Sequence, residues 1–331
     1  MPPLLHKLST NEWDDTRPAN NSNAMNNETA TPTYHVPVML NETLDALDIQ
    51  PNGIYVDVTF GGGGHSNAIL QRLGKEGHLY SFDQDTDVCG HLPQDDRFTF
   101  VHGNFRFVRN FLRYHGVDKI DGLLADLGVS SHHFDDEERG FSFRFDGPLD
   151  MRMNQWATQT AATVVNTYEA EELAKMFRNY GELSQANRIA QRLVAARATQ
   201  PVETISQLLD IVKPLISPKH EKKELAQLFQ ALRIEVNHEL KALETLLNTL
   251  PVILKPEGKA VFLTYHSLED RMVKNFFKSG NIDGKVEKDF YGRVQAPMKA
   301  VGKQQTASDE EQETNPRSRS ARLRVGMLNN D

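Results

Sequence analysis

Short apolar runs alternate with amphipathic stretches along the first 126 residues of the chain. Leu40, Leu44 and Leu47 recur at helical spacing, which predicts a helix over residues 40–47. Four later runs have the length and apolar character of buried strands, and helical segments separate them; the runs are 54–58, 78–82, 98–101 and 120–126. This alternation predicts an α/β fold, with a parallel sheet covered by helices on both faces.

The alternation stops after Asp126. Helical spacing then dominates, and strand character returns only at residues 259–265; the helical segments are 170–180, 185–198, 205–212 and 225–247. The simplest explanation is a helical domain inserted into an α/β domain. We therefore predict four parts: a disordered tail rich in Asn, Thr and Pro (1–33), the first part of the α/β domain (34–137), the inserted helical domain (138–236) and the second part of the α/β domain (237–331).

The last of these helical segments carries one apolar stripe, from Leu225 to Leu243, at a spacing of 3.6 residues. Such a stripe is typical of a helix that packs on a core. Arg233 and Asn237 lie four positions apart on the same segment, so we expect their side chains to face either a ligand or water.

The composition is that of a soluble globular protein, with 39% hydrophobic and 25% charged residues among 331. No apolar run approaches the ~20 residues that a membrane-spanning helix needs, and the N-terminus lacks the apolar segment of a secretory signal. The single cysteine, Cys89, excludes an internal disulfide and a cysteine-only metal cluster. These features predict a cytoplasmic protein with no membrane partner.

The net charge of −8 argues against nonspecific coating of nucleic acid. The charges are segregated near the C-terminus, however, where an acidic stretch, 309–313, precedes a basic one, 315–324. The arginines of the basic stretch are Arg317, Arg319, Arg322 and Arg324. They predict a local phosphate-binding patch that the net charge conceals.

Four consecutive glycines, Gly61–Gly64, connect the first predicted strand to a helix. Glycine leaves room where a backbone must turn tightly and approach a ligand, and between a strand and a helix that ligand is usually a nucleotide or nucleoside. An ordinary tight turn is the alternative. Ser66 stands where the dinucleotide fingerprint requires its third glycine, and no Gly-Lys-Ser/Thr sequence follows, so neither a dinucleotide loop nor a P-loop is indicated.

An acidic residue, Asp83, ends the second predicted strand about 20 positions after Gly63. At that distance its carboxylate can accept hydrogen bonds from both hydroxyls of a ribose. A glycine loop followed by such an acid suits NAD and also S-adenosylmethionine. Because the glycine that accompanies a pyrophosphate is missing, a cofactor without phosphates fits better.

Side chains at the ends of the later strands extend this candidate site. Phe105, after the third strand, either flanks an adenine ring or belongs to the core. Asp126 ends the fourth strand, where ligands bind in open α/β sheets, and either accepts a hydrogen bond from an amine or caps a turn. The acidic loop 132–138 resembles a metal site in composition but lacks ligand spacing, so we predict a solvated loop and no metal.

The fifth predicted strand ends in the sequence Tyr-His-Ser-Leu-Glu-Asp-Arg, residues 265–271. It places a histidine, an acid pair and an arginine at the same edge of the sheet. With Ser267 as the cap and Asp270 at the capping-box position, the capping of the next helix explains part of this motif.

The chain resembles the bacterial small-subunit ribosomal RNA methyltransferase H family, whose members methylate the N4 amine of a decoding-site cytidine. The matching segments follow one order along the chain: HVPVMLNE (35–42), DVTFGGGGHS (57–66), DLGVSS (126–131), RGFSF (139–143), DGPLDMRM (146–153), FQALRIEVN (229–237), HSLEDR (266–271) and NPRSRSARLR (315–324). The resemblance implies a Rossmann-like, S-adenosylmethionine-dependent methyltransferase sheet interrupted by a helical substrate domain. It also implies small-subunit ribosomal RNA or the 30S particle as the partner, and it is compatible with a homodimer.

The same resemblance implies that seven residues contact S-adenosylmethionine: Gly63, Gly64, His65, Asp83, Phe105, Asp126 and His133. Members of the family often carry Pro-Gln where this chain has His132-His133. The contact implied for His133 therefore falls at a position where this chain departs from the family pattern.

The expected reaction is methyl transfer to a weakly nucleophilic amine, whose lone pair is delocalised into the cytosine ring. We predict that Asp126 accepts a hydrogen bond from this amine and so localises the lone pair. Contacts to RNA phosphates are expected from Arg317, Arg319, Arg322 and Arg324. The phenylalanines of residues 141–145 either stack on the target base or pack the inserted domain. A nicotinamide-dependent oxidoreductase and a non-catalytic RNA-binding protein are the alternatives.

Overall fold

The structure is a computed structural model, and it describes residues 37–129, 134 and 136–329. These residues belong to one compact unit. The predicted tail (1–33) and the predicted cofactor contact His133 lie outside the described residues. In the described part of the chain, no helix has both the length and the apolar character needed to cross a membrane.

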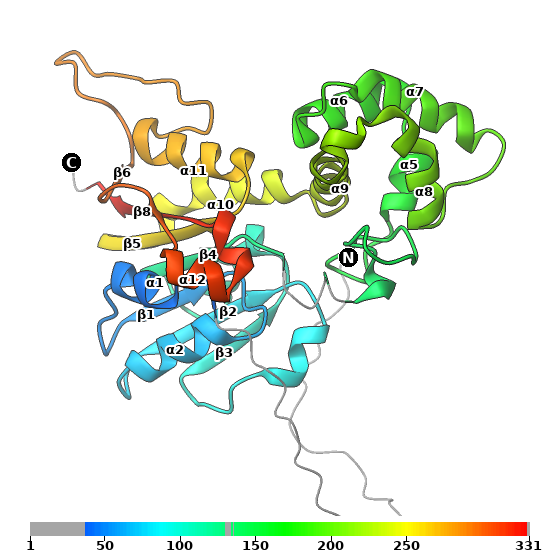
Figure 1. Cartoon of the computed structure of the whole chain (residues 1–331). Coiled ribbons are helices and arrows are strands. Elements are labelled where there is room, and N and C mark those ends of the chain that lie inside the picture. Colours follow the sequence, from blue (N-terminus) through cyan, green and yellow to red (C-terminus); the bar gives the residue numbers. More distant parts are fainter. Residues whose placement is uncertain (1–36, 130–133, 135, 330–331) are drawn as a thin grey trace, which may run out of the picture. The chain divides into compact units, whose positions relative to one another are not determined.

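An eight-stranded sheet forms the centre of the α/β part (Figure 1). Its strands lie in the order β3-β2-β1-β4-β5-β8-β6, with β7 paired to β8; their bounds are β1 Ile54–Asp57, β2 His78–Asp83, β3 Phe98–His102, β4 Ile120–Asp126, β5 Leu254–Thr264, β6 Met298–Ala300, β7 Gln305–Thr306 and β8 Arg322–Leu328. Strands β1 to β5 are parallel, as predicted. Asp126 at the end of β4 pairs with Leu263 of β5, so both strands end at the same edge.

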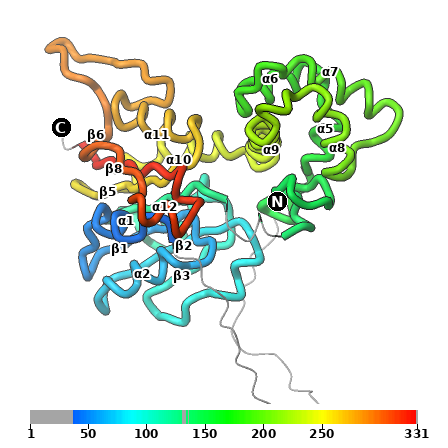
Figure 2. Tube along the Cα trace, in the orientation of Figure 1, coloured from blue at the N-terminus to red at the C-terminus, as the bar shows by residue number. Residues whose placement is uncertain are grey.

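The C-terminal strands depart from the predicted parallel sheet. Strand β8 runs antiparallel to β5, with Arg322 opposite Thr264, and β6 and β7 pair antiparallel to β8. Figure 2 shows β8, near the red end of the chain, beside β5. Leu323 and Val325 are buried, whereas Arg322 and Arg324 next to them are more exposed. The basic stretch thus contains a period-two strand pattern, which the sequence analysis interpreted only as a charged patch.

Helices cover both faces of this sheet. Helices α1 (Leu40–Leu47) and α2 (Gly64–Arg72) bury their apolar sides against one face. Helices α3 (Val108–Tyr114), α10 (Glu239–Ile253) and α11 (Ser267–Ser279) pack on the other. Burial of each leucine, valine or phenylalanine in these layers contributes roughly 1.5–3 kcal/mol. The short α12 (Asp309–Thr314) precedes the 3-10 turn Pro316–Ser320.

The residues between β4 and α10 have a hydrophobic core of their own. It is built by the helices α5 Ala161–Thr167, α6 Ala170–Gly181, α7 Ala186–Arg197, α8 Ile205–Val212 and α9 Glu221–Asn237. Its buried members run from Phe141 to Val236 and include none of the sheet residues. This agrees with an inserted helical region, whose boundaries at residues 138 and 236 stay a prediction.

The single helix expected over residues 225–247 is wrong. The chain breaks between α9 and α10 at His238, whose φ of 51° lies in the left-handed region. The break allows Arg233 of α9 to reach Glu239 of α10 with two hydrogen bonds of 2.8 Å. The apolar stripe continues on both sides of the break, so the periodicity alone could not show it.

Candidate active site

The carboxyl ends of the parallel strands β1, β2, β4 and β5 bring the candidate residues together at one edge of the sheet. The loop after β1 carries the glycines, Asp83 ends β2 and Asp126 ends β4. The segment 265–269 follows β5 directly. Residues that are far apart in sequence therefore meet here because their strands point the same way.

The four glycines of the loop serve different purposes. A Cβ at Gly62 would meet nothing within 4 Å, and one at Gly61 only the Thr59 carbonyl, so open space lies beside this backbone. A Cβ at Gly63 would lie 2.8 Å from the Phe60 ring, and one at Gly64 would lie 2.2 Å from Pro37. Gly61 and Gly63 also have φ values of 52° and 76°, which favour glycine. The first two glycines thus leave room for a ligand, while the last two are required by packing.

Asp83 is hydrogen-bonded to the glycine loop. Its Oδ2 accepts from the backbone N–H of Gly61 at 2.8 Å, and its Oδ1 accepts from the N–H of Asp85 at 3.0 Å. These two bonds orient the carboxylate. The side chain predicted to bind ribose is fixed next to the open side of the loop.

Below the loop, a buried acid that the sequence analysis did not select holds the strand and helix together. Asp57, at the end of β1, is fully buried and accepts a 2.7 Å hydrogen bond from Ser66 Oγ. Ser66 Oγ also lies 2.8 Å from Ser81 Oγ of β2. Burial raises the pKa of Asp57, and the Ser66 bond works in the opposite direction. Ser66, the residue in place of a third glycine, is therefore part of a buried network.

Asp126 is held by three neighbouring groups. Its backbone N–H donates to Thr59 Oγ1 at 2.7 Å, and its Oδ1 accepts from Tyr265 Oη at 2.7 Å. Its Oδ2 lies 3.7 Å from Nδ1 of His65. The Asp126 side chain is 23% exposed, so a substrate can reach it. Its partial burial raises the pKa of the carboxyl.

His65, for which the resemblance implies a cofactor contact, links Asp126 to the segment before α1. Its Nε2 lies 3.2 Å from the carbonyl oxygen of Val38. A carbonyl can only accept, so Nε2 carries the proton of a neutral ring and Nδ1 presents its lone pair to Asp126. His65 thus connects the start of α2 to the carboxylate at the end of β4.

The turn after β5 is capped differently from the prediction. The N-cap of α11 is His266, not Ser267, and the capping-box acid is Glu269, not Asp270. Glu269 Oε2 accepts from the backbone N–H groups of Tyr265 and His266, at 3.0 and 3.4 Å. Burial would raise the pKa of Glu269, but the charge of His266, its hydrogen bond and Arg233 together hold it below the usual range. This capping fixes the position of Tyr265.

Three potential metal ligands meet next to this turn, namely Glu239, His266 and Glu269, whose ligand atoms all lie within 4.8 Å of one another. Arg233 already binds both carboxylate oxygens of Glu239, so a guanidinium supplies the positive charge here. Asn237 bonds the Met153 N–H and the Met151 carbonyl. Arg233 and Asn237 therefore face protein groups, rather than the ligand or water expected for them.

The four arginines of the basic stretch differ in their surroundings. Arg324 donates to both carboxylate oxygens of Asp270, at 2.7 and 3.0 Å, and is largely buried. Arg322 reaches the same carboxylate at 3.2 Å but is half exposed. Arg319 is exposed and donates from Nε to a backbone carbonyl, whereas Arg317 is half-buried. The predicted RNA contact of Arg324 thus belongs to a side chain that is already engaged in a structural ion pair.

The aromatic candidates lie mostly in cores. Phe141 is buried in the core of the helical region, and Phe143 packs edge-on against Phe229 with the ring centroids 5.4 Å apart. For these two side chains, the structure supports packing rather than base stacking. Phe105 is partly buried against the sheet core next to the end of β3, so it retains an accessible part.

A buried arginine from the helical region also reaches the edge of the site. Arg139 is 8% exposed, and its Nη2 lies 3.0 Å from Asp85 Oδ2, two residues after Asp83. It also pairs with Asp87 and donates to the Arg152 carbonyl at 3.0 Å. Arg139 belongs to the family motif at residues 139–143. In the structure it connects the start of the helical region to the loop after β2.

An open α/β sheet, a glycine loop bonded to an acid on the second strand, and a carboxylate at the end of the fourth strand are typical of an α/β enzyme that binds a nucleoside cofactor. The chain belongs to the MraW methylase family, whose model matches residues 32–327. This membership confirms the predicted S-adenosylmethionine-dependent methyltransferase, and the sheet order agrees with the predicted Rossmann-like fold.

Several relatives are similar over nearly their whole length. A protein of Parabacteroides distasonis named "Ribosomal RNA small subunit methyltransferase H" is 60% identical over 294 residues, covering 88% of this chain and 96% of the relative. A protein of the same name from Porphyromonas gingivalis is 54% identical over 298 residues, with the same coverage. A crystal structure of a putative methyltransferase from Streptococcus mutans in complex with SAH covers 89% of this chain and 100% of that chain, at 11% identity and a TM-score of 0.36.

Proposed function

We propose that the protein transfers a methyl group from S-adenosylmethionine to the N4 amine of a decoding-site cytidine in small-subunit ribosomal RNA. The observation that carries the proposal is the carboxylate of Asp126, fixed by Tyr265 at the end of β4 beside the glycine loop. The relatives named as small-subunit ribosomal RNA methyltransferases support the choice of substrate.

The residues present fit the cofactor. Gly61 and Gly62 leave open space beside the backbone, and Asp83 lies at the same loop, where its carboxylate can accept from ribose hydroxyls. His65 lies in the first turn of α2, and the exposed part of Phe105 lies just after β3. When bound, S-adenosylmethionine supplies an electrophilic methyl group on a sulfonium. Gly63 and Gly64 shape the loop through packing, so we assign them an indirect part in binding.

Asp126 then acts on the amine. A cytosine N4 amine is a weak nucleophile, because its lone pair is delocalised into the ring. The Oδ2 of Asp126 accepts a hydrogen bond from this amine while Tyr265 holds Oδ1 in place. The methylated nitrogen is acidic before it loses its proton, so Asp126 need not be a strong base. Alignment of the reacting groups contributes on the order of 7–11 kcal/mol.

The target base of the RNA must be unstacked from its neighbours to reach Asp126, and this unstacking costs a few kcal/mol. Exposed arginines near the end of β5, Arg319 and Arg322, are suited to contact phosphates, whereas Arg324 supports the strand.

A cytoplasmic location and a homodimer remain predictions. The inserted helical region is proposed as the substrate domain.

The two alternative functions fit less well. A nicotinamide-dependent oxidoreductase requires a third loop glycine, but Ser66 occupies that position and is bonded to the buried Asp57. A non-catalytic RNA-binding protein would not need an accessible carboxylate beside an open glycine loop.

Calorimetry with S-adenosylmethionine and with NAD tests the cofactor, and only the first should bind. A single-turnover assay with unmethylated small-subunit particles and labelled S-adenosylmethionine then tests the reaction. The proposal expects one N4-methylated cytidine per particle. Binding of the particles without methyl transfer would support the RNA-binding alternative instead.

A further inference from the structure

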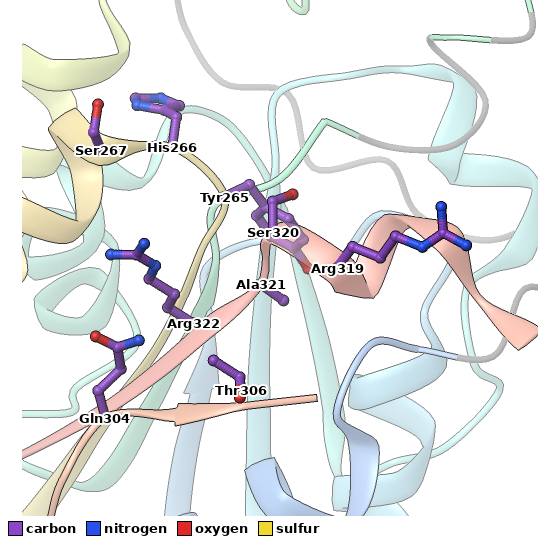
Figure 3. A pocket seen from close by; sticks show the side chains of 9 residues that line it. All are labelled: Tyr265, His266, Ser267, Gln304, Thr306, Arg319, Ser320, Ala321 and Arg322. Atoms are coloured by element: carbon purple, nitrogen blue, oxygen red, sulfur yellow. The ribbon is translucent and has the colours of Figure 1, made fainter. Parts of the chain in front are cut away.

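A cavity of about 250 Å³ lies next to the candidate active site, at the end of β5 (Figure 3). Its lining comes from the segment after β5, from the region of β7 and from the start of β8: Tyr265, His266, Ser267, Gln304, Thr306, Arg319, Ser320, Ala321 and Arg322. Tyr265 is shared by both places, because its hydroxyl holds Asp126 while its side chain forms a wall of the cavity. A group bound in the cavity therefore lies one side chain away from the proposed catalytic carboxylate.

A cluster of Arg322, Arg324 and Asp270 beside the cavity carries one excess positive charge. Arg322 and Arg324 share a single carboxylate, that of Asp270. Asp270 and Arg324 are largely buried, at 8% and 15% side-chain exposure, whereas Arg322 is 50% exposed. Burial would raise the pKa of Asp270, but its hydrogen bonds to the two guanidinium groups hold it below the usual range, so it stays ionised. Two cations and one anion sum to one excess positive charge, and Arg322 is its accessible member.

The remaining lining supplies neutral donors. Gln304 Oε1 accepts from Arg324 at 2.8 Å, which fixes the amide and leaves its nitrogen to donate. The hydroxyls of Ser320 and Thr306 lie on the same cavity, and Figure 3 shows Arg322 between Gln304 and His266. The Arg319 side chain is directed away from the other side chains in that view. Of the two arginines in the lining, Arg322 is therefore the one that lies among the neutral donors.

We infer that this cavity binds a phosphodiester group of the polynucleotide substrate, next to the nucleotide that is methylated. A guanidinium can donate two parallel hydrogen bonds to two oxygens of one phosphate, and the neighbouring neutral groups can donate further ones. The inference rests on the proposed function, because it takes RNA as the substrate. It assigns the arginines of the basic stretch different tasks: Arg322 binds the phosphate, and Arg324 with Asp270 holds Arg322 in place.

The test compares Arg322→Ala with a matched control, Arg72→Ala. Arg72 is an exposed arginine in the last turn of α2, it does not line the cavity, and it also pairs with one aspartate. For the full-length protein we expect Arg322→Ala to raise the KM for small-subunit particles about tenfold, as a lost charged hydrogen bond does. The slope of log affinity against log salt for single-stranded RNA should fall by about 0.7, the value for one phosphate. Affinity for S-adenosylmethionine should not change.

Arg322→Lys keeps the charge and should restore most of the salt slope, while Gln304→Ala should raise the KM less. Inorganic phosphate at millimolar concentration should compete with RNA on the wild type and lose this effect on Arg322→Ala; competition that persists on the variant places the anion elsewhere. Identical KM values and salt slopes for Arg322→Ala and Arg72→Ala would overturn the inference. If the wild type does not methylate small-subunit RNA at all, the proposed function fails instead, and the two failures are distinguishable.

Discussion

Tyr265 Oη donates a 2.7 Å hydrogen bond to Asp126 Oδ1, and so joins two residues that are 139 positions apart in sequence. The contact forms because β4 and β5 are parallel neighbours that end at the same edge. The Tyr265 ring lies against Gly128, where a Cβ would come within 2.8 Å of it. One oxygen of the carboxylate is thus fixed, and the other remains for the substrate amine and His65.

Replacing Tyr265 by Phe removes this hydrogen bond and keeps the ring. We expect kcat to fall about tenfold, because hydrogen bonds to charged groups contribute roughly 1.5–3 kcal/mol. The Tyr265 bond opposes the rise in the pKa of Asp126 that burial causes, so its loss moves the acid limb of the pH–rate profile to higher pH. A lower rate with an unshifted acid limb would mean that Tyr265 acts only through packing.

Replacing Asp126 by Asn should separate activity from stability. We expect the methylation rate to fall roughly 10²–10⁴-fold, the usual contribution of a positioned proton acceptor. Affinity for S-adenosylmethionine has to be measured separately by calorimetry, because Asp126 is also a predicted cofactor contact. Full methylation by Asp126→Asn with unchanged cofactor affinity would remove Asp126 from the reaction.

The same substitution has a predictable effect on stability. Burial raises the pKa of Asp126 in the folded protein above the value of about 3.9 for an unfolded aspartate. The folded state then binds the proton of the Asp126 carboxyl more tightly than the unfolded state does. As the pH rises from the unfolded pKa through the folded pKa, this group therefore lowers the free energy of unfolding. Near neutral pH, Asp126→Asn should therefore have a Tm no lower than that of the wild type. A clear drop in Tm would show that the ionised carboxylate stabilises the fold.

Substitutions of two loop glycines test whether the cofactor binds beside this backbone. Gly62→Ala should keep the Tm within a degree or two, because its Cβ meets nothing within 4 Å, yet weaken S-adenosylmethionine binding. Gly64→Ala should lower the Tm, because its Cβ would lie 2.2 Å from Pro37. Thermal unfolding and calorimetry measure the two effects. Equal cofactor affinity for Gly62→Ala and the wild type would place the ligand away from this backbone.

Arg139 should be important for stability rather than for chemistry. Arg139→Ala removes the buried ion pair between Arg139 and Asp85, and breaking such a pair costs roughly 3–5 kcal/mol. Arg72→Ala, which breaks an exposed pair with Asp45, should cost at most about 1 kcal/mol. Urea unfolding of both variants provides the comparison. Similar free energies of unfolding would show that the Arg139 pair is not a stabilising contact.

The sequence predicted the parts of this molecule that depend on local patterns. The glycine loop and Asp83 could be placed together because each follows a recognisable strand, and β4 was predicted with its observed bounds, Ile120–Asp126. The cap of α11 was misplaced because serine is a preferred N-cap, whereas His266 makes the bond in the structure. One residue with a left-handed φ, His238, divides a helix without changing the apolar stripe around it.

Long-range contacts lay beyond the sequence analysis. The Tyr265 hydroxyl could not be connected to Asp126, because nothing local shows which strand lies beside β4. Strand β8 was hidden because two of its alternating positions are arginines, and Arg324 appeared to be available for RNA although Asp270 binds it. These features depend on sheet order and on side-chain partners, which only the folded chain provides.

The most direct test of the account is mass spectrometry of the decoding-site RNA from cells with and without the gene for this protein. We predict that cells lacking it lose the N4-methyl group from one cytidine of the small-subunit RNA, and that the wild-type gene restores the group while the Asp126→Asn gene does not. An unchanged methylation pattern in the cells that lack the protein would contradict the proposed function.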